Sequence, residues 1–302
     1  MSAARSLAAW MGVVALAVGV SFPMGCTAAA QGAMDVQDAT RGSHGKVTLV
    51  AQDSAVAPGR SAELGLHFVL EKGWHIYWVN PGDSGEPPKV KWTVPEGYSV
   101  GEIDWPTPER LGRGTVVDYG YTGEVTLLAK LNVPDTAKAG SKAFAVADVN
   151  WLVCSEICLP EKSALRIELP VESKARRNPE EATLFARARA RLPMPALKVW
   201  DAEALDQGGD YLLRLLTGVQ ETSATFFPLR SGEIENSAPQ KVLKFTGGMR
   251  ITLVKAANTT ASSNAGKPND GHAKGTIDGV VKFGSGKSYK VSARIRPALP
   301  AN

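Results

Sequence analysis

Two cysteines, Cys154 and Cys158, are the residues whose type and spacing could carry covalent chemistry in this chain. They flank Ser155, Glu156 and Ile157, which would form a three-residue turn if the chain makes a hairpin there. Directly opposed residues of an antiparallel hairpin have Cα atoms about 4.5 to 5.5 Å apart, which lies within the range that a disulfide accepts. The spacing therefore permits a disulfide across the turn.

Such a bond has a structural and a redox interpretation. Closing a five-residue loop stabilises a protein by only about 2 kcal/mol on the chain-entropy model, which is little for a domain with an ample core. A short disulfide near the surface is also readily reduced and exchanged, as a thiol–disulfide relay requires. The spacing by itself leaves both interpretations open.

Other chemistries lack their defining residues. The sequence contains no GxSxG, HExxH, Walker or CxxC motif, which argues against hydrolase, metalloprotease, nucleotide-binding and thioredoxin-like functions. Cys154, Cys158 and His75 could form a soft site for Cu(I), because thiolates select that ion, so copper handling stays an alternative. We otherwise predict no metal site and no bound cofactor.

The N-terminus resembles a secretory signal. Arg5 precedes an apolar run over residues 7–22 and the small residues 27–30, so we expect a signal peptide over residues 1–30 with cleavage after Ala30. The alternatives are a membrane anchor, although the run is shorter than the roughly 20 residues needed to span a bilayer, and lipidation at Cys26. The mature chain is then exported, without a membrane span, into the periplasm or a similar compartment where disulfides persist.

Composition predicts a folded protein and gives no sign of a nucleic-acid or membrane partner. At 44% apolar and 21% charged residues, 302 residues suffice for two domains. The net charge of +4 comes without a dense Lys/Arg run, so it gives no argument for nucleic acid or an anionic membrane as a partner.

The elements that must position the cysteines are strands. Leu64, Leu66, Phe68 and Leu70 share one face of a predicted strand, and the turn at residues 71–73 predicts a hairpin with the alternating residues 74–79. Similar alternation recurs at residues 125–133, 144–153 and 165–171. We predict an all-β fold that begins with an immunoglobulin-like antiparallel β-sandwich over residues 44–172.

A linker helix and a second β domain follow in the sequence. Residues 173–195 contain Asn178 as the expected helix cap, Pro179 at the first helical position and an apolar stripe, with an end before Pro193. Alternation at residues 211–216, 225–229, 250–254, 277–283 and 289–295 predicts a second, smaller β-sandwich over residues 196–298. Residues 257–276 lack Ile, Leu, Val, Met and aromatic side chains, which predicts a mobile loop there.

A set of ordered motifs carries a family resemblance. They are residues 73–85 (GWHIYWVNPGDSG), 105–110 (WPTPER), 118–121 (DYGY) and 150–161 (NWLVCSEICLPE). Together they resemble the periplasmic N-terminal region of DsbD-type thiol:disulfide interchange proteins, closest to their ScsB-like branch. Residues 226–229 (FFPL) and 234–240 (IENSAPQ) resemble the second periplasmic β domain of that branch.

The resemblance implies a function and a site. In that family an immunoglobulin-like domain takes electrons from a thioredoxin-like module, supplied through a membrane domain, and passes them to oxidised periplasmic proteins. It implies that Cys154 and Cys158 are the redox pair, with Cys158 attacking and Cys154 resolving, and that His75 and Tyr77 lie beside them. A shielding cap loop maps to Asp118, Tyr119 and Gly120.

The chain departs from full reductases of this type because it ends at Asn302 without the membrane and thioredoxin-like domains. We therefore expect a separate thioredoxin-like or membrane-bound electron donor and oxidised periplasmic client proteins. The alternative is a non-enzymatic binding or scaffold protein.

The flanking residues predict how the two sulfurs differ. Cys154 ends an apolar strand and should be buried, whereas Cys158 opens into Leu159-Pro160, where proline should end strand pairing. Glu156 should oppose ionisation of both thiols. We predict a pair that is not strongly activated, with exchange depending on displacement of the cap around Tyr119.

Overall fold

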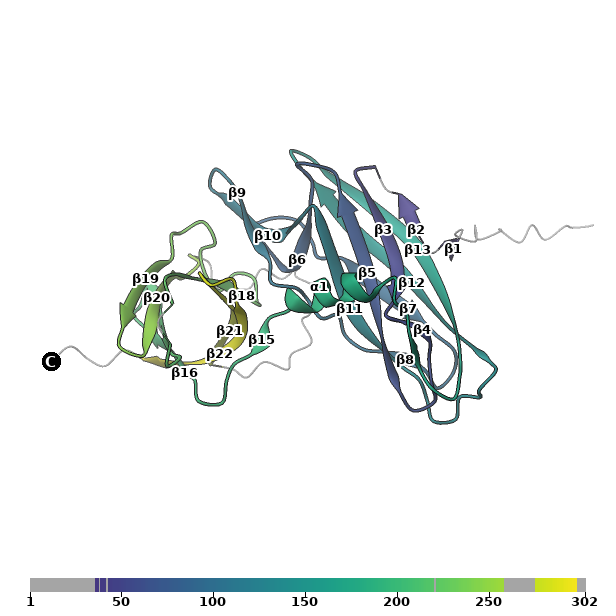
Figure 1. The fold of residues 1–302 in the computed structure, drawn as a ribbon. Coiled ribbons are helices and arrows are strands. Elements are labelled where there is room, and N and C mark those ends of the chain that lie inside the picture. Colours follow the sequence, from purple (N-terminus) through teal and green to yellow (C-terminus); the bar gives the residue numbers. More distant parts are fainter. Residues whose placement is uncertain (1–35, 38, 42, 220, 258–274, 298–302) are drawn as a thin grey trace, which may run out of the picture. The chain divides into compact units, whose positions relative to one another are not determined.

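Two sheets packed face to face form the first β region, residues 36–177 (Figure 1). The structure is a computed structural model that describes residues 36–37, 39–41, 43–219, 221–257 and 275–297. The predicted signal peptide, Cys26 and residues 258–274 of the predicted mobile loop lie outside the described residues. No helix among the described residues is long and apolar enough to cross a membrane.

The first sheet carries the cysteines. Its strands, in spatial order, are β1 (Val36–Gln37), β13 (Cys158–Pro170), β12 (Lys142–Cys154), β6 (His75–Gly82), β10 (Val116–Thr122) and β9 (Glu109–Arg113), and β7 (Lys89–Thr93) also pairs with β12. Every neighbouring pair is antiparallel except β1 with β13. Alternate residues of β12, from Ala143 to Val153, point into the core, as period-two patterning predicts.

The facing sheet closes the sandwich. Its strands are β2 (Ala39–Arg41), β3 (Gly45–Ala51), β5 (Ser61–Leu70), β11 (Glu124–Asn132) and β8 (Ser99–Val100), and a small separate sheet pairs β14 (Arg176–Arg177) with β4 (Asp53–Ala55). Leu64, Leu66, Phe68 and Leu70 of β5 are all buried, as predicted. The predicted β5–β6 hairpin is wrong. The two strands lie in different sheets, because β5 pairs with β3 and β11 whereas β6 pairs with β12 and β10.

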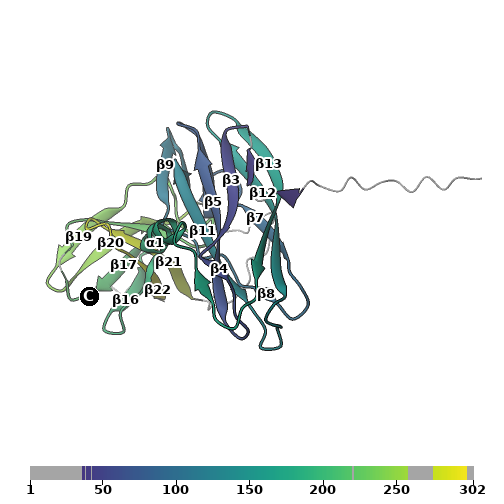
Figure 2. The same ribbon diagram turned by 45° about the vertical axis from the view of Figure 1, so that its right-hand side comes forward.

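Helix α1 (Ala182–Ala190) packs against the outer face of the second sheet. Phe185 and Ala188 bury against Leu128 of β11, and Figures 1 and 2 both show α1 lying across β11. The predicted start at Pro179 is wrong: residues 179–181 form a turn, in which the Asn178 side chain accepts a hydrogen bond from the Glu180 amide instead of capping the helix. The end before Pro193 is confirmed.

The second β region, residues 194–297, is one eight-stranded sheet that curls on itself (Figure 1). Its spatial order is β18 (Ala224–Pro228), β21 (Thr276–Phe283), β22 (Ser288–Pro297), β16 (Asp201–Asp206), β17 (Asp210–Leu216), β20 (Gly248–Val254) and β19 (Lys241–Phe245), with β15 (Met194–Pro195) beside β22. The predicted all-β class is confirmed, although a single curled sheet takes the place of two facing sheets here.

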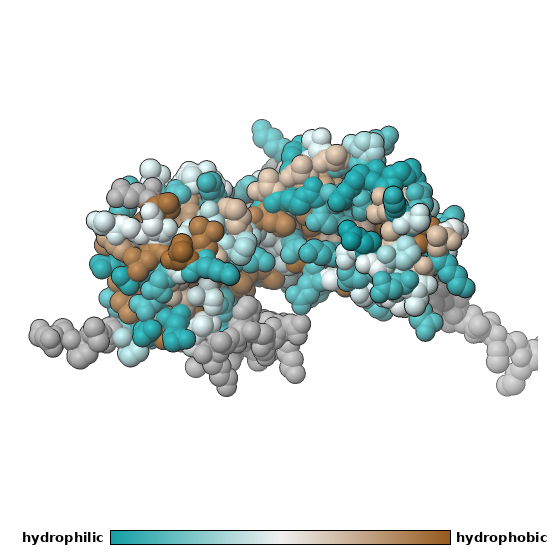
Figure 3. Space-filling model, turned by 60° about the horizontal axis from the view of Figure 1, so that its bottom comes forward, coloured by the Kyte–Doolittle hydropathy of each residue, from teal (hydrophilic) through white to brown (hydrophobic). Residues whose placement is uncertain are grey.

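The two β regions have separate main cores but share some buried residues. Leu213, Ile251, Val281 and their neighbours form the core of the second region. Its Phe227 and Val280, however, are buried in the core of the first region, and Met34–Asn302 forms one compact unit. The predicted domain boundaries at residues 172 and 196 stay a prediction. Exposed apolar side chains such as Val199 and Leu243 interrupt the hydrophilic surface. Figure 3 shows hydrophobic residues in brown on one face of the molecule.

Candidate redox site

The two cysteines close the longest hairpin among the described residues. Strands β12 and β13 pair over their whole length, and Cys154 lies directly opposite Cys158 at its end. The three residues between them turn the chain, and the Ser155 amide donates to the Ile157 carbonyl at 2.9 Å. The structure forms the Cys154–Cys158 disulfide with Cα atoms 4.1 Å apart. The predicted turn between opposed cysteines is confirmed.

The two sulfurs differ in exposure. Cys154 is fully buried at the end of the apolar strand β12, whereas Cys158 is exposed, as predicted. The predicted cause at Pro160 is wrong, because Pro160 pairs with Leu152 inside β13. The proline is tolerated because, within the described residues, β13 has no neighbour at Pro160 on the side away from β12. An incoming thiol therefore reaches Cys158 before Cys154.

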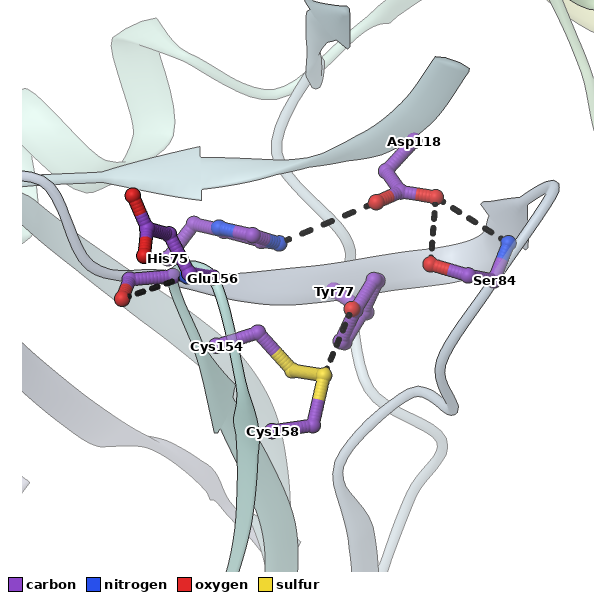
Figure 4. The surroundings of a disulfide bond; sticks show 8 residues. His75, Tyr77, Ser84, Asp118, Cys154, Glu156 and Cys158 are labelled. Atoms are coloured by element: carbon purple, nitrogen blue, oxygen red, sulfur yellow. Dashed lines mark hydrogen bonds and ion pairs between the residues drawn. A yellow bond between two sulfur atoms is a disulfide. The ribbon is translucent and has the colours of Figure 1, made fainter. Parts of the chain in front are cut away.

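Tyr77 and His75 project from β6 on the same side, two residues apart. His75 is the register partner of Cys154, and the Tyr77 hydroxyl lies 3.5 Å from Sγ of Cys158 (Figure 4). The two rings meet edge to face with centroids 5.1 Å apart. The structure thus brings both predicted neighbours to the disulfide, while their part in any reaction stays a prediction.

A buried carboxylate, that of Asp118, lies next to His75. Asp118 of β10 places Oδ2 4.0 Å from Nε2 of His75, and its Oδ1 accepts hydrogen bonds from the amide and hydroxyl of Ser84 at 3.0 and 2.8 Å (Figure 4). His75 and Asp118 are both buried. The carboxylate therefore links the β6 side of the site to the loop at residues 83–88. Ser84 is not among the predicted site residues, although it lies within the motif at residues 73–85.

The 83–88 loop lies directly on the Tyr77 ring. Gly85 has a φ of +74°, and a Cβ atom built there would lie 2.1 Å from Cζ of Tyr77. Only glycine fits both the left-handed backbone and this close approach. The loop therefore covers the aromatic side chain that contacts Cys158.

The predicted cap loop is a strand. Tyr119 and Gly120 belong to β10 and are buried between β6 and β9, where a Cβ on Gly120 would meet the Ile76 carbonyl oxygen. Tyr119 packs edge to face on Trp78 and Phe227, away from the disulfide, and burial raises its pKa well above the usual range. The expectation of a loop came from the family resemblance and not from the local residue pattern. The 83–88 loop takes the covering position instead.

A groove flanks the disulfide hairpin. It has a volume of about 420 Å³ and is lined by apolar and charged side chains that include Pro87, Trp151, Pro160, Glu86 and Lys89. Within the turn itself, Ile157 is 61% exposed. The surface around Cys158 therefore offers apolar contacts as well as charges of both signs.

No group of three or more His, Cys, Asp or Glu side chains with a metal-binding arrangement occurs in the described part of the chain. In the structure Cys154 and Cys158, the two thiols of the copper alternative, are bonded to each other.

Comparison with known proteins identifies the first β region. Residues 46–170 match the family model of the N-terminal domain of the thiol:disulfide interchange protein DsbD. This part of the chain is therefore similar to a domain of a thiol–disulfide interchange family. No curated protein matches the chain.

Solved structures extend the likeness in fold. The chain is similar to the N-terminal periplasmic domain of ScsB from Proteus mirabilis, with a TM-score of 0.57 and 17% identity over 84% of this chain and 94% of that chain. At this identity the match shows a shared fold. Chimeric titin Z1Z2 (12% identity, 88% of this chain and 100% of that one) and the periplasmic chaperone SfaE (9%, 83% and 100%) match with TM-scores of 0.19 and 0.18, too low to support any argument.

Proposed function

We propose that this chain, whose residues 46–170 match the DsbD N-terminal family model, relays electrons through Cys154 and Cys158 between a membrane-linked reductase partner and oxidised periplasmic client proteins. The observation that carries the proposal is the unequal exposure of the two sulfurs in one disulfide. A relay needs one reachable sulfur for mixed disulfides and one protected sulfur that resolves them.

Reduction of the pair takes two displacement steps. A donor thiolate attacks Sγ of Cys158, the Cys154–Cys158 bond breaks, and its electron pair leaves on the Cys154 sulfur. The second donor thiolate then attacks the donor sulfur of this mixed disulfide and releases Cys158. The donor ends oxidised, and the pair has gained two electrons and two protons.

Transfer to the client runs through the same sulfur. The Cys158 thiolate attacks a client disulfide and expels one client thiolate, which leaves a mixed disulfide on Cys158. Cys154 then attacks Cys158 and expels the second client thiolate. The pair is oxidised again, and the client has gained the two electrons.

The surroundings of the pair support slow exchange without a partner. Glu156 adds a negative charge to the turn and opposes thiolate formation, and Cys154 is buried. The 83–88 loop, which lies on Tyr77, is the segment that a partner would move to reach both sulfurs. The apolar groove and Ile157 beside Cys158 provide contacts for such a partner.

Trapping tests the proposal. The Cys154→Ser chain cannot resolve a mixed disulfide on Cys158, so it should accumulate covalent partners in cells, and mass spectrometry should identify a donor and clients. The Cys158→Ser chain is the matched control and should trap far less, because Cys154 is buried. Equal trapping by the two variants, or trapping by neither, would contradict the relay.

The proposed compartment is the periplasm. The solved relative is a periplasmic domain, and the predicted signal peptide over residues 1–30 would export the chain. Fractionation of cells should find the protein in the periplasm with its N-terminus at residue 31, or lipid-linked at Cys26 if the alternative processing occurs. Retention of the full-length chain in the cytoplasm would contradict this placement.

A further inference from the structure

The second β region contributes a side chain to the loop over Tyr77. Asn236 is buried in the segment between β18 and β19, and its Nδ2 donates to Oδ1 of Asp83 at 2.7 Å. Its Oδ1 accepts the Tyr119 hydroxyl at 2.9 Å. All these residues belong to the compact unit Met34–Asn302. Asn236 therefore bonds with both ends of its amide to the first β region.

Direct contacts continue from Asp83 to the sulfur. The other oxygen of Asp83 accepts the Val117 amide at 2.7 Å, which fixes the carboxylate against β10. The loop then runs through Ser84, which is bonded to Asp118, to Gly85, whose backbone lies on the Tyr77 ring. The Tyr77 hydroxyl meets Sγ of Cys158 (Figure 4).

A second contact from the same region supports the start of this loop. Oδ1 of Asn80 accepts the Gly82 amide at 3.1 Å and the Ser231 hydroxyl at 2.8 Å, and its Nδ2 donates to the Pro228 carbonyl at 2.8 Å. Residues of the second β region thus bond to positions on both sides of Gly82. These contacts lie at the start of the 83–88 loop.

We propose that Asn236 is a positioning residue of the redox site, which holds the 83–88 loop on Tyr77 through Asp83 and so keeps the Tyr77 hydroxyl at the Cys158 sulfur. In the reduced protein this hydroxyl donates to the Cys158 thiolate and favours the ionised, reactive form. The inference rests on the proposed function only in taking Cys158 as the reactive sulfur. Its test needs no protein partner.

Exchanging the two polar groups isolates the Asn236–Asp83 contact. Asn236→Asp keeps an acceptor for Tyr119 but sets two carboxylates against each other at the Asp83 contact. Adding Asp83→Asn restores an amide–carboxylate pair, since the new amide can donate to residue 236 and still accept the Val117 amide. The double exchange also restores the net charge. Ser237→Ala is the control, because the Ser237 side chain bonds to Glu235 and not to the loop.

The measurement is the rate of iodoacetamide labelling of Cys158 against pH in the full chain carrying Cys154→Ser, with the label located by mass spectrometry. Asn236→Asp and Tyr77→Phe should each slow labelling at neutral pH by about threefold and move the half-maximal pH upward. Tyr77→Phe removes the hydrogen bond to the Cys158 thiolate directly, and Asn236→Asp removes it by releasing the loop that holds Tyr77. The two changes together should slow labelling no further. The Asn236→Asp/Asp83→Asn exchange should restore the parent profile, and Ser237→Ala should keep it.

An unchanged profile for Asn236→Asp, with thermal unfolding showing a folded protein, would overturn the inference. So would slow labelling that the double exchange does not restore. Failure of the proposed relay would appear separately, as absence of trapped partners with normal labelling.

Discussion

The two β regions of this chain build similar cores and differ in where they place reactive groups. Each buries alternate apolar residues of antiparallel strands. The first ends its longest hairpin in a disulfide with Tyr77, His75 and Asp118 around it, whereas the second contains no cysteine. The strand pattern therefore builds the framework of both regions, and the chemistry depends on one turn and the loop beside it.

The regions are nevertheless joined by a shared core. Phe227 of β18 packs edge to face on Trp78 and Tyr119, with ring centroids 6.2 and 5.4 Å away. The neighbouring Phe226 points to the opposite side, into the core of the second region. One strand therefore supplies adjacent aromatic side chains to both cores.

The largest expected effect tests this joint core. Phe227→Ala should lower the free energy of unfolding by about 3 to 5 kcal/mol, because it leaves a cavity against two aromatic rings. The whole protein should still unfold in one urea transition. Phe226→Ala is the matched control for the second core. If Phe227→Ala shifts only one of two separate transitions, the regions are independent and the comparison fails.

Next in size is the close approach of the 83–88 loop to Tyr77. Gly85→Ala should cost about 2 to 4 kcal/mol, from a positive φ and overlap with the ring. Gly73→Ala is matched, since its φ is +86° with nothing within 4 Å of the added Cβ, and should cost about 1 kcal/mol. Equal losses of unfolding free energy for Gly85→Ala and Gly73→Ala in urea would show that the loop does not contact Tyr77 closely.

Reduction of the disulfide should have a smaller effect. Closing a five-residue loop stabilises by about 2 kcal/mol, so unfolding with and without a thiol reductant should differ by about that amount. The first β region should remain folded when reduced, because its core does not depend on the bond. A loss near 5 kcal/mol, or unfolding on reduction, would favour a structural disulfide.

An effect of similar size, which depends on pH, concerns only the second β region. Burial raises the pKa of Glu233 to about 7, and Arg230 offsets only part of this. Since the folded pKa lies above that of the unfolded chain, its contribution to stability is fully present below about pH 4.5 and is lost as pH rises through 7. Glu233→Gln should remove this decline, about 1 to 3 kcal/mol in urea titrations at several pH values. An unchanged pH profile would contradict the assignment.

The sequence predicted most strands because period-two patterning reports burial on one face. It predicted β6 as a strand but paired it with the wrong neighbour, and the cap loop that the resemblance implied at Tyr119 is strand β10, whose residues are buried on both faces. Choosing which sheet a strand joins depends on long-range pairing, which local spacing does not contain.

The site was predictable where the chain itself brings residues together. Cys154 and Cys158 oppose each other across a local turn, and the burial of Cys154 followed from the apolar strand that it ends, whereas Cys158 is exposed for a reason other than the predicted one at Pro160. Asn236 is 153 residues from Asp83 in sequence, so no local pattern could place it beside the loop. Ser84 and Gly85 acquire their roles only through contacts with Asp118 and Tyr77.

The redox equilibrium of the Cys154–Cys158 pair tests the proposed electron relay most simply. The full chain should be equilibrated in glutathione buffers of known potential, and the oxidised fraction of this pair read by thiol labelling and mass spectrometry. The relay predicts a reversible two-electron transition at a potential above about −300 mV. A pair that stays oxidised below about −300 mV would be a structural bond and would contradict the account.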